Sequence, residues 1–346
     1  IQRDSNDTQQ VELPRFVDMA SEGWYAGDLL VARPAKEMPL LLETEDLFLA
    51  VRAEPAGAKT AEPPADRSGP ASPPRQHPPT GLLQPTRTGP AERLHRPGLL
   101  LENSGGTYLL VPLDGRWPIL PAPSKPSEKS LPQEKDASKS SADKAGGLGG
   151  KAAPLSEAQL LHLLEAKASS QSATSPEADA PSQPARYITP SGQQTLWMDV
   201  VWPYSWDLPL WLALGKVDSV EVLHSHFRRN EWLAEEKEGR RRDMARFPGR
   251  WGHGLWGQYI YFQILECGVR LSPSAGSASG LCPNPVGYNR VYVHLEGPPS
   301  WQTWWEAFRQ GRVMVTNGPL VRLSVEGKPP GHEFTAPEGQ KLELEL

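Results

Sequence analysis

Two histidines of this 346-residue chain have a spacing that could hold a metal ion. His224 and His226 stand in the phrase Glu-Val-Leu-His-Ser-His, directly after a strand expected at residues 217–223. Alternate residues of a strand point to the same side, so both imidazoles could reach one ion, with Glu221 facing the other way. The pair could instead belong to a hydrogen-bonded polar cluster. The residues alone leave both interpretations open.

Other polar side chains give weaker signals. His253 lies in Arg-Trp-Gly-His-Gly and is more typical of a loop residue bonded to backbone, and His294 follows Val293 in a strand, which favours packing or exposure over catalysis. Ser225, Ser277 and Ser279 lack the Gly-x-Ser-x-Gly setting of a hydrolase nucleophile. The sequence therefore does not indicate a serine hydrolase.

Short apolar strands alternate with helical patterns, which is typical of an α/β fold with a largely parallel sheet. Strands are expected at 99–102, 108–113, 217–223, 290–295 and 313–316, and helices at 208–214, 258–267 and 301–310. Ser300 can cap the last helix. The repeated unit predicted from this order is a strand followed by a helix.

Two stretches rich in Pro, Ala and Ser interrupt this order, at 53–97 and 121–185, in a chain with 37 prolines. They have too few apolar residues to offset the entropy of ordering, so we expect two long disordered insertions. The second contains the capping-box pattern Ser156-Glu-Ala-Gln followed by four leucines, which predicts a short helix at 156–168. Such a helix is more typical of a segment that docks on its own domain or frays than of a partner-binding motif.

Charge and cysteine content restrict the function only in part. The net charge of −5 has both signs interspersed and gives no support for nucleic acid as a partner, and no apolar run is long enough to span a membrane. Cys267 and Cys282 have no metal-binding spacing, so free thiols are favoured. The chain begins at Ile1 and stops inside a strand-like pattern, which indicates a fragment of a longer protein.

Several phrases resemble a known family. Gly-Trp-Tyr-Ala-Gly-Asp-Leu starts at Gly23, Trp-Asp-Leu-Pro at Trp206, Val-Asp-Ser-Val-Glu-Val at Val217, and Pro-Asn-Pro-Val-Gly-Tyr-Asn-Arg at Pro283. They resemble the CehA/McbA-like metallohydrolases of the polymerase and histidinol phosphatase (PHP) superfamily. The resemblance implies a distorted (β/α) barrel with its site at the carboxyl ends of the strands.

The resemblance also implies a division of the chain. Residues 23–52, 98–120 and 186–322 would form the barrel, 53–97 and 121–185 the insertions, 1–22 the end of a preceding segment, and 323–346 the truncated start of a β domain.

The metal ligands that the family motifs imply are missing. Leu30 and Ala32 occupy the two places of the first His-x-His motif, and Trp202 stands where a His-Pro pair is expected. Ala278 and Gly280 occupy the two ligand positions of a Gly-Ser-Asp-x-His motif. These residues supply no imidazole or carboxylate, so the usual site should be empty.

The favoured function is therefore a catalytically degenerate PHP-like domain that serves as a binding or structural module in a larger protein and needs no cofactor. The alternative is a metal-dependent hydrolase of a phosphoester, ester or amide, with one divalent ion (Zn, Mn or Fe) on Asp28, Glu102, His224 and His226.

Tryptophans suggest where a binding module could act. Trp202, Trp206 and Trp256 could form an aromatic surface for a glycan or a protein partner, although core packing also explains many tryptophans. An exported or periplasmic location is favoured for the whole protein, but the sequence does not fix it.

Overall fold

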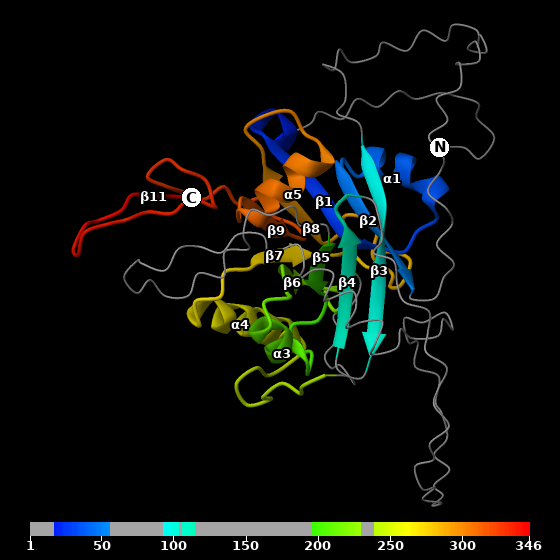
Figure 1. The fold of residues 1–346 in the computed structure, drawn as a ribbon, viewed down its shortest axis with the longest axis horizontal. Helices are drawn as coiled ribbons and strands as arrows, with labels where there is room; N and C mark the ends of the chain where they lie inside the picture. Colours follow the sequence, from blue (N-terminus) through cyan, green and yellow to red (C-terminus); the bar gives the residue numbers. More distant parts are fainter. Residues whose placement is uncertain (1–16, 56–92, 104–105, 115–195, 230–238) are drawn as a thin grey trace, which may run out of the picture.

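Nine strands form one sheet that curves into a nearly closed barrel in the computed structural model of this chain (Figure 1). The structure describes residues 17–55, 93–103, 106–114, 196–229 and 239–346. The strand order is β7-β6-β5-β4-β3-β2-β1-β8-β9. The strands are β1 (Trp24–Val31), β2 (Leu49–Pro55), β3 (Leu94–Asn103), β4 (Gly106–Pro112), β5 (Leu196–Val200), β6 (Ser219–Leu223), β7 (Ser272–Ala275), β8 (Arg290–His294) and β9 (Val313–Thr316).

The two ends of the strand order approach each other. β7 contacts both β9 and β1, and an isolated parallel bridge joins Val31, the last residue of β1, to Ser279, which follows β7. The barrel interior is packed with large side chains, among them Trp197, Leu109 and Val291. The sheet therefore encloses a filled core rather than a channel.

Helix α5 (Trp301–Arg309) closes the end of the barrel where the parallel strands begin. Its Trp304 indole donates to the carbonyl of Tyr25 at the start of β1, and the Trp301 indole donates to Leu113 just after β4. Trp197 of β5 stacks on Phe308 with centroids 5.1 Å apart. As expected, Ser300 caps this helix, accepting a hydrogen bond from the Thr303 amide.

Two helices cover the outer face of β5 and β6. Leu208 and Trp211 of α3 (Leu208–Ala213) and Tyr261 and Ile264 of α4 (Gly252–Glu266) share a core with Met198 of β5. The remaining helices among the described residues are α1 (Met38–Thr44) and the short 3-10 helices η1 (Met19–Glu22) and η2 (Ala35–Glu37). In the part of the chain that the structure describes, no helix has the length and apolar character needed to cross a bilayer.

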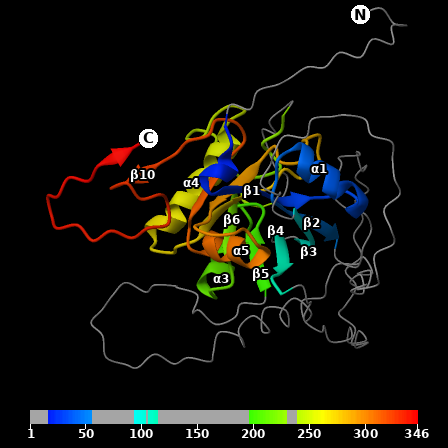
Figure 2. The ribbon, with the colours of Figure 1, turned by 90° about the horizontal axis from the view of Figure 1, so that it is seen from above.

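The C-terminal residues extend away from the barrel (Figure 2) and contain a two-stranded antiparallel sheet, β10 (Ser324–Val325) with β11 (Leu344–Glu345). Arg322 anchors the beginning of this extension, because its guanidinium contacts both carboxylate oxygens of Glu22, at 2.5 and 2.7 Å. The expected insertions at 53–97 and 121–185, including the helix at 156–168, lie mostly or wholly outside the described residues.

The prediction of a mixed α/β fold is confirmed, but the predicted regular alternation of strand and helix is wrong for the described residues. β3, β4 and β5 pair antiparallel in succession, and β8 pairs antiparallel with β1 and β9. β2 lies parallel to β3 and β5 parallel to β6. Few helices accompany these strands, so much of the barrel closes through direct strand contacts and through α5.

Candidate functional site at the mouth of the barrel

Tyr204 is the centre of a buried group of aromatic and imidazole rings at the end of the barrel opposite α5. It follows β5 and is fully buried. Its ring lies nearly parallel to the rings of Trp202 and Trp256, with interplanar angles of 14° and centroids 6.1 and 5.7 Å away. These rings fill the place where a barrel enzyme would open its active site.

Three histidines lie against this tyrosine. The ring centroids of His224 and His226 are 5.0 Å apart, those of His226 and His253 are 4.5 Å apart, and those of His224 and His253 are 6.3 Å apart. All three side chains are buried. The prediction that His253 is a loop residue is wrong: it lies in the first turn of α4, where the helix meets the mouth.

Hydrogen bonds orient part of this group. The Tyr204 hydroxyl lies 3.1 Å from Nε2 of His226, and the His226 amide donates to Nδ1 of His224 at 3.4 Å. The indole of Trp202 donates to the hydroxyl of Ser225 at 3.4 Å. Within the described residues, Nε2 of His224 is buried without a hydrogen-bond partner.

Burial lowers the pKa of His224 well below its usual range, and the neighbouring His226 and His253 lower it further. The charged form of an imidazole is costly in such a dry, ring-lined environment. His224 is therefore neutral at pH 7. Neutral imidazoles are potential metal ligands, but in the described residues no group of three or more His, Cys, Asp or Glu side chains is arranged to hold an ion.

Asp28 holds the loops that follow β7 instead of joining the histidines. Its Oδ1 accepts hydrogen bonds from the amides of Leu30 at 3.2 Å and Ser277 at 2.9 Å, and its Oδ2 accepts from Gly287 at 2.7 Å. The side chain is fully buried, and burial raises its pKa to about 6 against the opposing effect of these hydrogen bonds. Both carboxylate oxygens of Asp28 thus accept hydrogen bonds from backbone amides.

Glu102, the other carboxylate considered for a rearranged metal site, is exposed near the end of β3, where it pairs with Thr107 of β4. Its exposure contrasts with the complete burial of His224. The structure brings His224 and His226 together with His253 and Tyr204. It does not bring them together with both Asp28 and Glu102.

Four positions considered as lost metal ligands lie side by side. The amide of Ala278 donates to the carbonyl of Leu30 at 2.8 Å, and the amide of Ala32 donates to Ser279 at 2.7 Å. Gly280 approaches Ala32 so closely that a Cβ at this glycine would meet its carbonyl oxygen. The fifth position, Trp202, lies in the ring group around Tyr204. The sequence motifs thus converge in space, on apolar and small side chains.

Asp199 and Glu221 are two buried carboxyl groups inside the barrel, and no motif in the sequence predicts that they form a pair. Asp199 of β5 accepts hydrogen bonds from the hydroxyls of Ser219 and Ser274, both at 2.5 Å, and burial raises its pKa to about 6. Glu221 of β6 is fully buried, and neither of its oxygens has a hydrogen-bond partner among the described residues. Burial, followed by Asp199 and Asp28, raises the pKa of Glu221 well above its usual range.

The three tryptophans considered as a binding surface differ in exposure. Trp202 is 6% exposed and Trp256 is partly buried, whereas Trp206 is 58% exposed. Trp202 and Trp256 belong to the packed group around Tyr204, and only Trp206 presents most of its ring to solvent. Cys267 and Cys282 are free thiols, as predicted.

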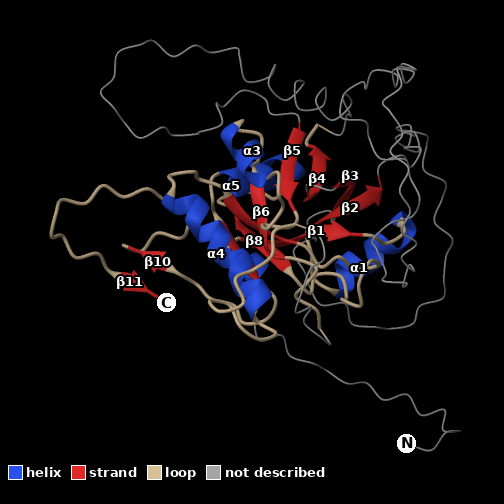
Figure 3. Ribbon diagram, turned by 90° about the horizontal axis from the view of Figure 1, so that it is seen from below, coloured by secondary structure: helices blue, strands red, loops and turns tan. Residues whose placement is uncertain are grey.

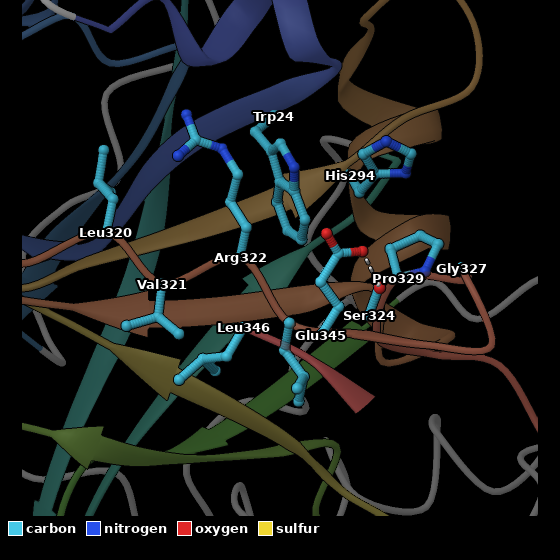
Figure 4. A pocket seen from close by; sticks show the side chains of 11 residues that line it. Trp24, His294, Leu320, Val321, Arg322, Ser324, Gly327, Pro329, Glu345 and Leu346 are labelled. Carbon is cyan, nitrogen blue, oxygen red and sulfur yellow. Dashed lines mark hydrogen bonds between the residues drawn. The ribbon is translucent and has the colours of Figure 1, made fainter. Parts of the chain in front are cut away.

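A cavity of about 760 Å³ lies away from this mouth, between the barrel and the C-terminal extension (Figure 4). Trp24 and His294 form one wall, with ring centroids 5.0 Å apart, and residues on both sides of β10 and β11 form the other. The cavity is open, and its two long charged side chains already have partners: Arg322 is paired with Glu22, and Glu345 accepts a hydrogen bond from Ser324. It brings no pair of catalytic groups together.

Comparison of the chain with protein-family models, curated proteins and solved structures finds no match. The resemblance to PHP metallohydrolases therefore rests on the sequence phrases and on the positions described above.

Proposed function

We propose that this chain is a binding or structural module built on a PHP-like barrel whose metal site has been replaced by packed side chains. One observation carries the proposal. Leu30, Ala32, Ala278 and Gly280, the positions at which metal ligands were expected, are neighbours and offer no side-chain nitrogen or oxygen. Divalent ions in hydrolases need several such donors at about 2 Å.

The packing of the mouth supports the same function. Tyr204 stacks with Trp202 and with Trp256, and its hydroxyl lies within hydrogen-bond distance of His226. A substrate would have to displace buried aromatic rings, each of which contributes on the order of 2 kcal/mol or more through burial. Binding of a glycan or protein partner is therefore expected on the outer surface, where Trp206 is exposed.

A catalytic assay tests the proposal. The chain should hydrolyse p-nitrophenyl phosphate, p-nitrophenyl acetate and an anilide no faster than buffer, with or without added Zn²⁺, Mn²⁺ or Fe²⁺. Metal-dependent turnover that is lost in His224→Ala and kept in His294→Ala would overturn it. His294 is the control because it is a partly buried histidine that contacts Trp24, outside the mouth.

One observation favours a metal-dependent hydrolase as the second candidate. His224, His226 and His253 lie with their rings within 6.3 Å of one another, and nitrogen donors of this kind suit zinc. A site on these residues would differ from the one expected from sequence, since His253 would replace Asp28 and Glu102. The ring nitrogens would have to turn toward a common point before they could share an ion.

A further inference from the structure

Helix α4 is apolar on its outer face as well as on its buried face. Its inner side packs Tyr261 and Ile264 against the sheet. On the opposite side Leu255, Phe262 and Leu265 are 53%, 56% and 38% exposed. These residues recur at helical spacing and form one stripe, the α4 stripe, that also includes Trp251 and Tyr259.

Such a stripe needs an explanation. A helix that is apolar all round is normally buried all round, whereas a surface helix carries polar residues on its outer side. Figure 3 shows α4 lying across the outside of the sheet. Phe247 and Arg246 pack on Tyr259 at one side of the stripe, while Leu255, Phe262 and Leu265 remain exposed. Contiguous exposed apolar surface of this kind marks an interaction site.

The order of residues along the α4 stripe is self-complementary in the antiparallel direction. A two-fold axis between Gln258 and Tyr259 would place Leu255 of one copy against Phe262 of the other, and the same contact would form a second time by symmetry. The helix of 15 residues is about 22 Å long, enough for four turns of contact. Gln258, the polar residue in the middle of the stripe, would meet Tyr259 of the second copy and could share a hydrogen bond with it.

Charge supports this direction. Arg250 lies over the Trp251 ring at 4.4 Å, at the beginning of the helix, and Glu266 stands at its end. The antiparallel arrangement brings Arg250 of each copy near Glu266 of the other, whereas a parallel one places like charges together. Exposed ion pairs add little affinity but select the orientation. The two helix dipoles also favour the antiparallel orientation.

We propose that the α4 stripe is the interface of a homodimer, in which α4 pairs antiparallel with α4 of a second copy. The two helices would pack as in a helical bundle, with aliphatic and aromatic side chains interdigitating. The interface lies on the outside of the barrel, so the dimer forms whether or not the mouth binds a metal ion.

Mass measurement by light scattering during gel filtration tests the dimer. The full chain should give twice its mass of 38.0 kDa at the highest loading of a dilution series from about 1 to 100 µM. Phe262→Glu, which places a charge in the centre of each symmetric contact, should give the single mass at every concentration. Leu40→Glu is the matched control because Leu40 is 65% exposed on α1, and it should remain dimeric.

Cross-linking tests the register. In a background with Cys267→Ser and Cys282→Ser, a mixture of Leu255→Cys and Phe262→Cys chains should form a disulfide between the two variants when oxidised. Each variant alone should cross-link much less. A chain that is monomeric throughout the dilution series would overturn the proposal. A dimer that survives Phe262→Glu would overturn it as well.

Discussion

The hydroxyl of Tyr204 lies 3.1 Å from Nε2 of His226, inside a group of rings where a barrel hydrolase would keep its active site open. The tyrosine follows β5 and the histidine follows β6, and both are buried. Their contact shows how the mouth is filled: aromatic faces pack against imidazoles, and a hydrogen bond between the tyrosine and the histidine orients the ring of His226.

Tyr204→Phe should lower the free energy of unfolding by about 1 to 2 kcal/mol, because it leaves Nε2 of His226 without the hydroxyl while the ring packing is kept. Urea unfolding followed by tryptophan fluorescence measures the change. Tyr288→Phe, at a partly buried tyrosine outside the mouth, is the control and should stay within about 0.5 kcal/mol of the parent chain. Equal effects of the two substitutions would show that the hydroxyl of Tyr204 does not stabilise the mouth.

Asp28→Asn should lower the free energy of unfolding by about 2 to 3 kcal/mol. The asparagine keeps one acceptor oxygen, so its amide group would face a backbone N–H that the carboxylate now accepts from. Asp243→Asn is a matched control, because the Asp243 carboxylate also accepts two backbone amides but is exposed. A destabilisation no larger than that of the control would contradict the structural role of Asp28.

Gly276→Ala should destabilise the barrel, because a Cβ there would lie 2.6 Å from Oε1 of Glu221 and would also collide with Leu30. Overpacking of this kind costs about 1 to 3 kcal/mol. Gly297→Ala is the control, since the same atom at Gly297 meets nothing within 4 Å. Thermal unfolding of both variants measures the difference, and similar midpoints would mean that the interior around Glu221 is looser than the structure shows.

Stability should depend on pH through Asp199. Its pKa of about 6 in the folded chain lies above the ordinary value of 3.8, so the folded chain binds the proton more tightly than the unfolded one. This contribution to stability is complete below pH 3.8 and is lost as the pH rises through about 6. A pKa shift from 3.8 to about 6 corresponds to a total change of about 3 kcal/mol in the free energy of unfolding.

Asp199→Asn removes this dependence. It also removes the part of the upward pKa shift of Glu221 that Asp199 causes, which acts in the same direction, whereas the opposite effect of His224 is common to both chains. Between pH 4 and pH 6, the parent chain should therefore lose about 2 kcal/mol more than the variant in urea unfolding. Parallel pH profiles of the two chains would show that Asp199 titrates normally in the folded state.

The sequence predicted elements where a local signal defines them. Ser300 before a run of aromatic residues predicted α5, and the strand expected at 217–223 contains β6. The beginning of α4 was missed because Gly252, Gly254 and Gly257 are typical of a loop. In the structure a Cβ at Gly254 would collide with Phe227, so glycine is the residue that permits this close packing.

The composition of the mouth could be predicted only in part. His224 and His226 share one local phrase, so their proximity follows from sequence. The approach of Tyr204 and His253 depends on how the loop after β5 and the beginning of α4 fold over the barrel, and no spacing along the chain reports such a tertiary contact. Asp28 lies close to the loops beyond β7 for the same reason.

Metal content tests the central claim most directly. The chain, purified without chelator and analysed by mass spectrometry for zinc, manganese and iron, should contain far less than one ion per molecule, and its thermal midpoint should not change with EDTA. A content near one ion per molecule, lost in the His224→Ala and His226→Ala variants and kept in His294→Ala, would contradict the proposal that packed side chains have replaced the metal site.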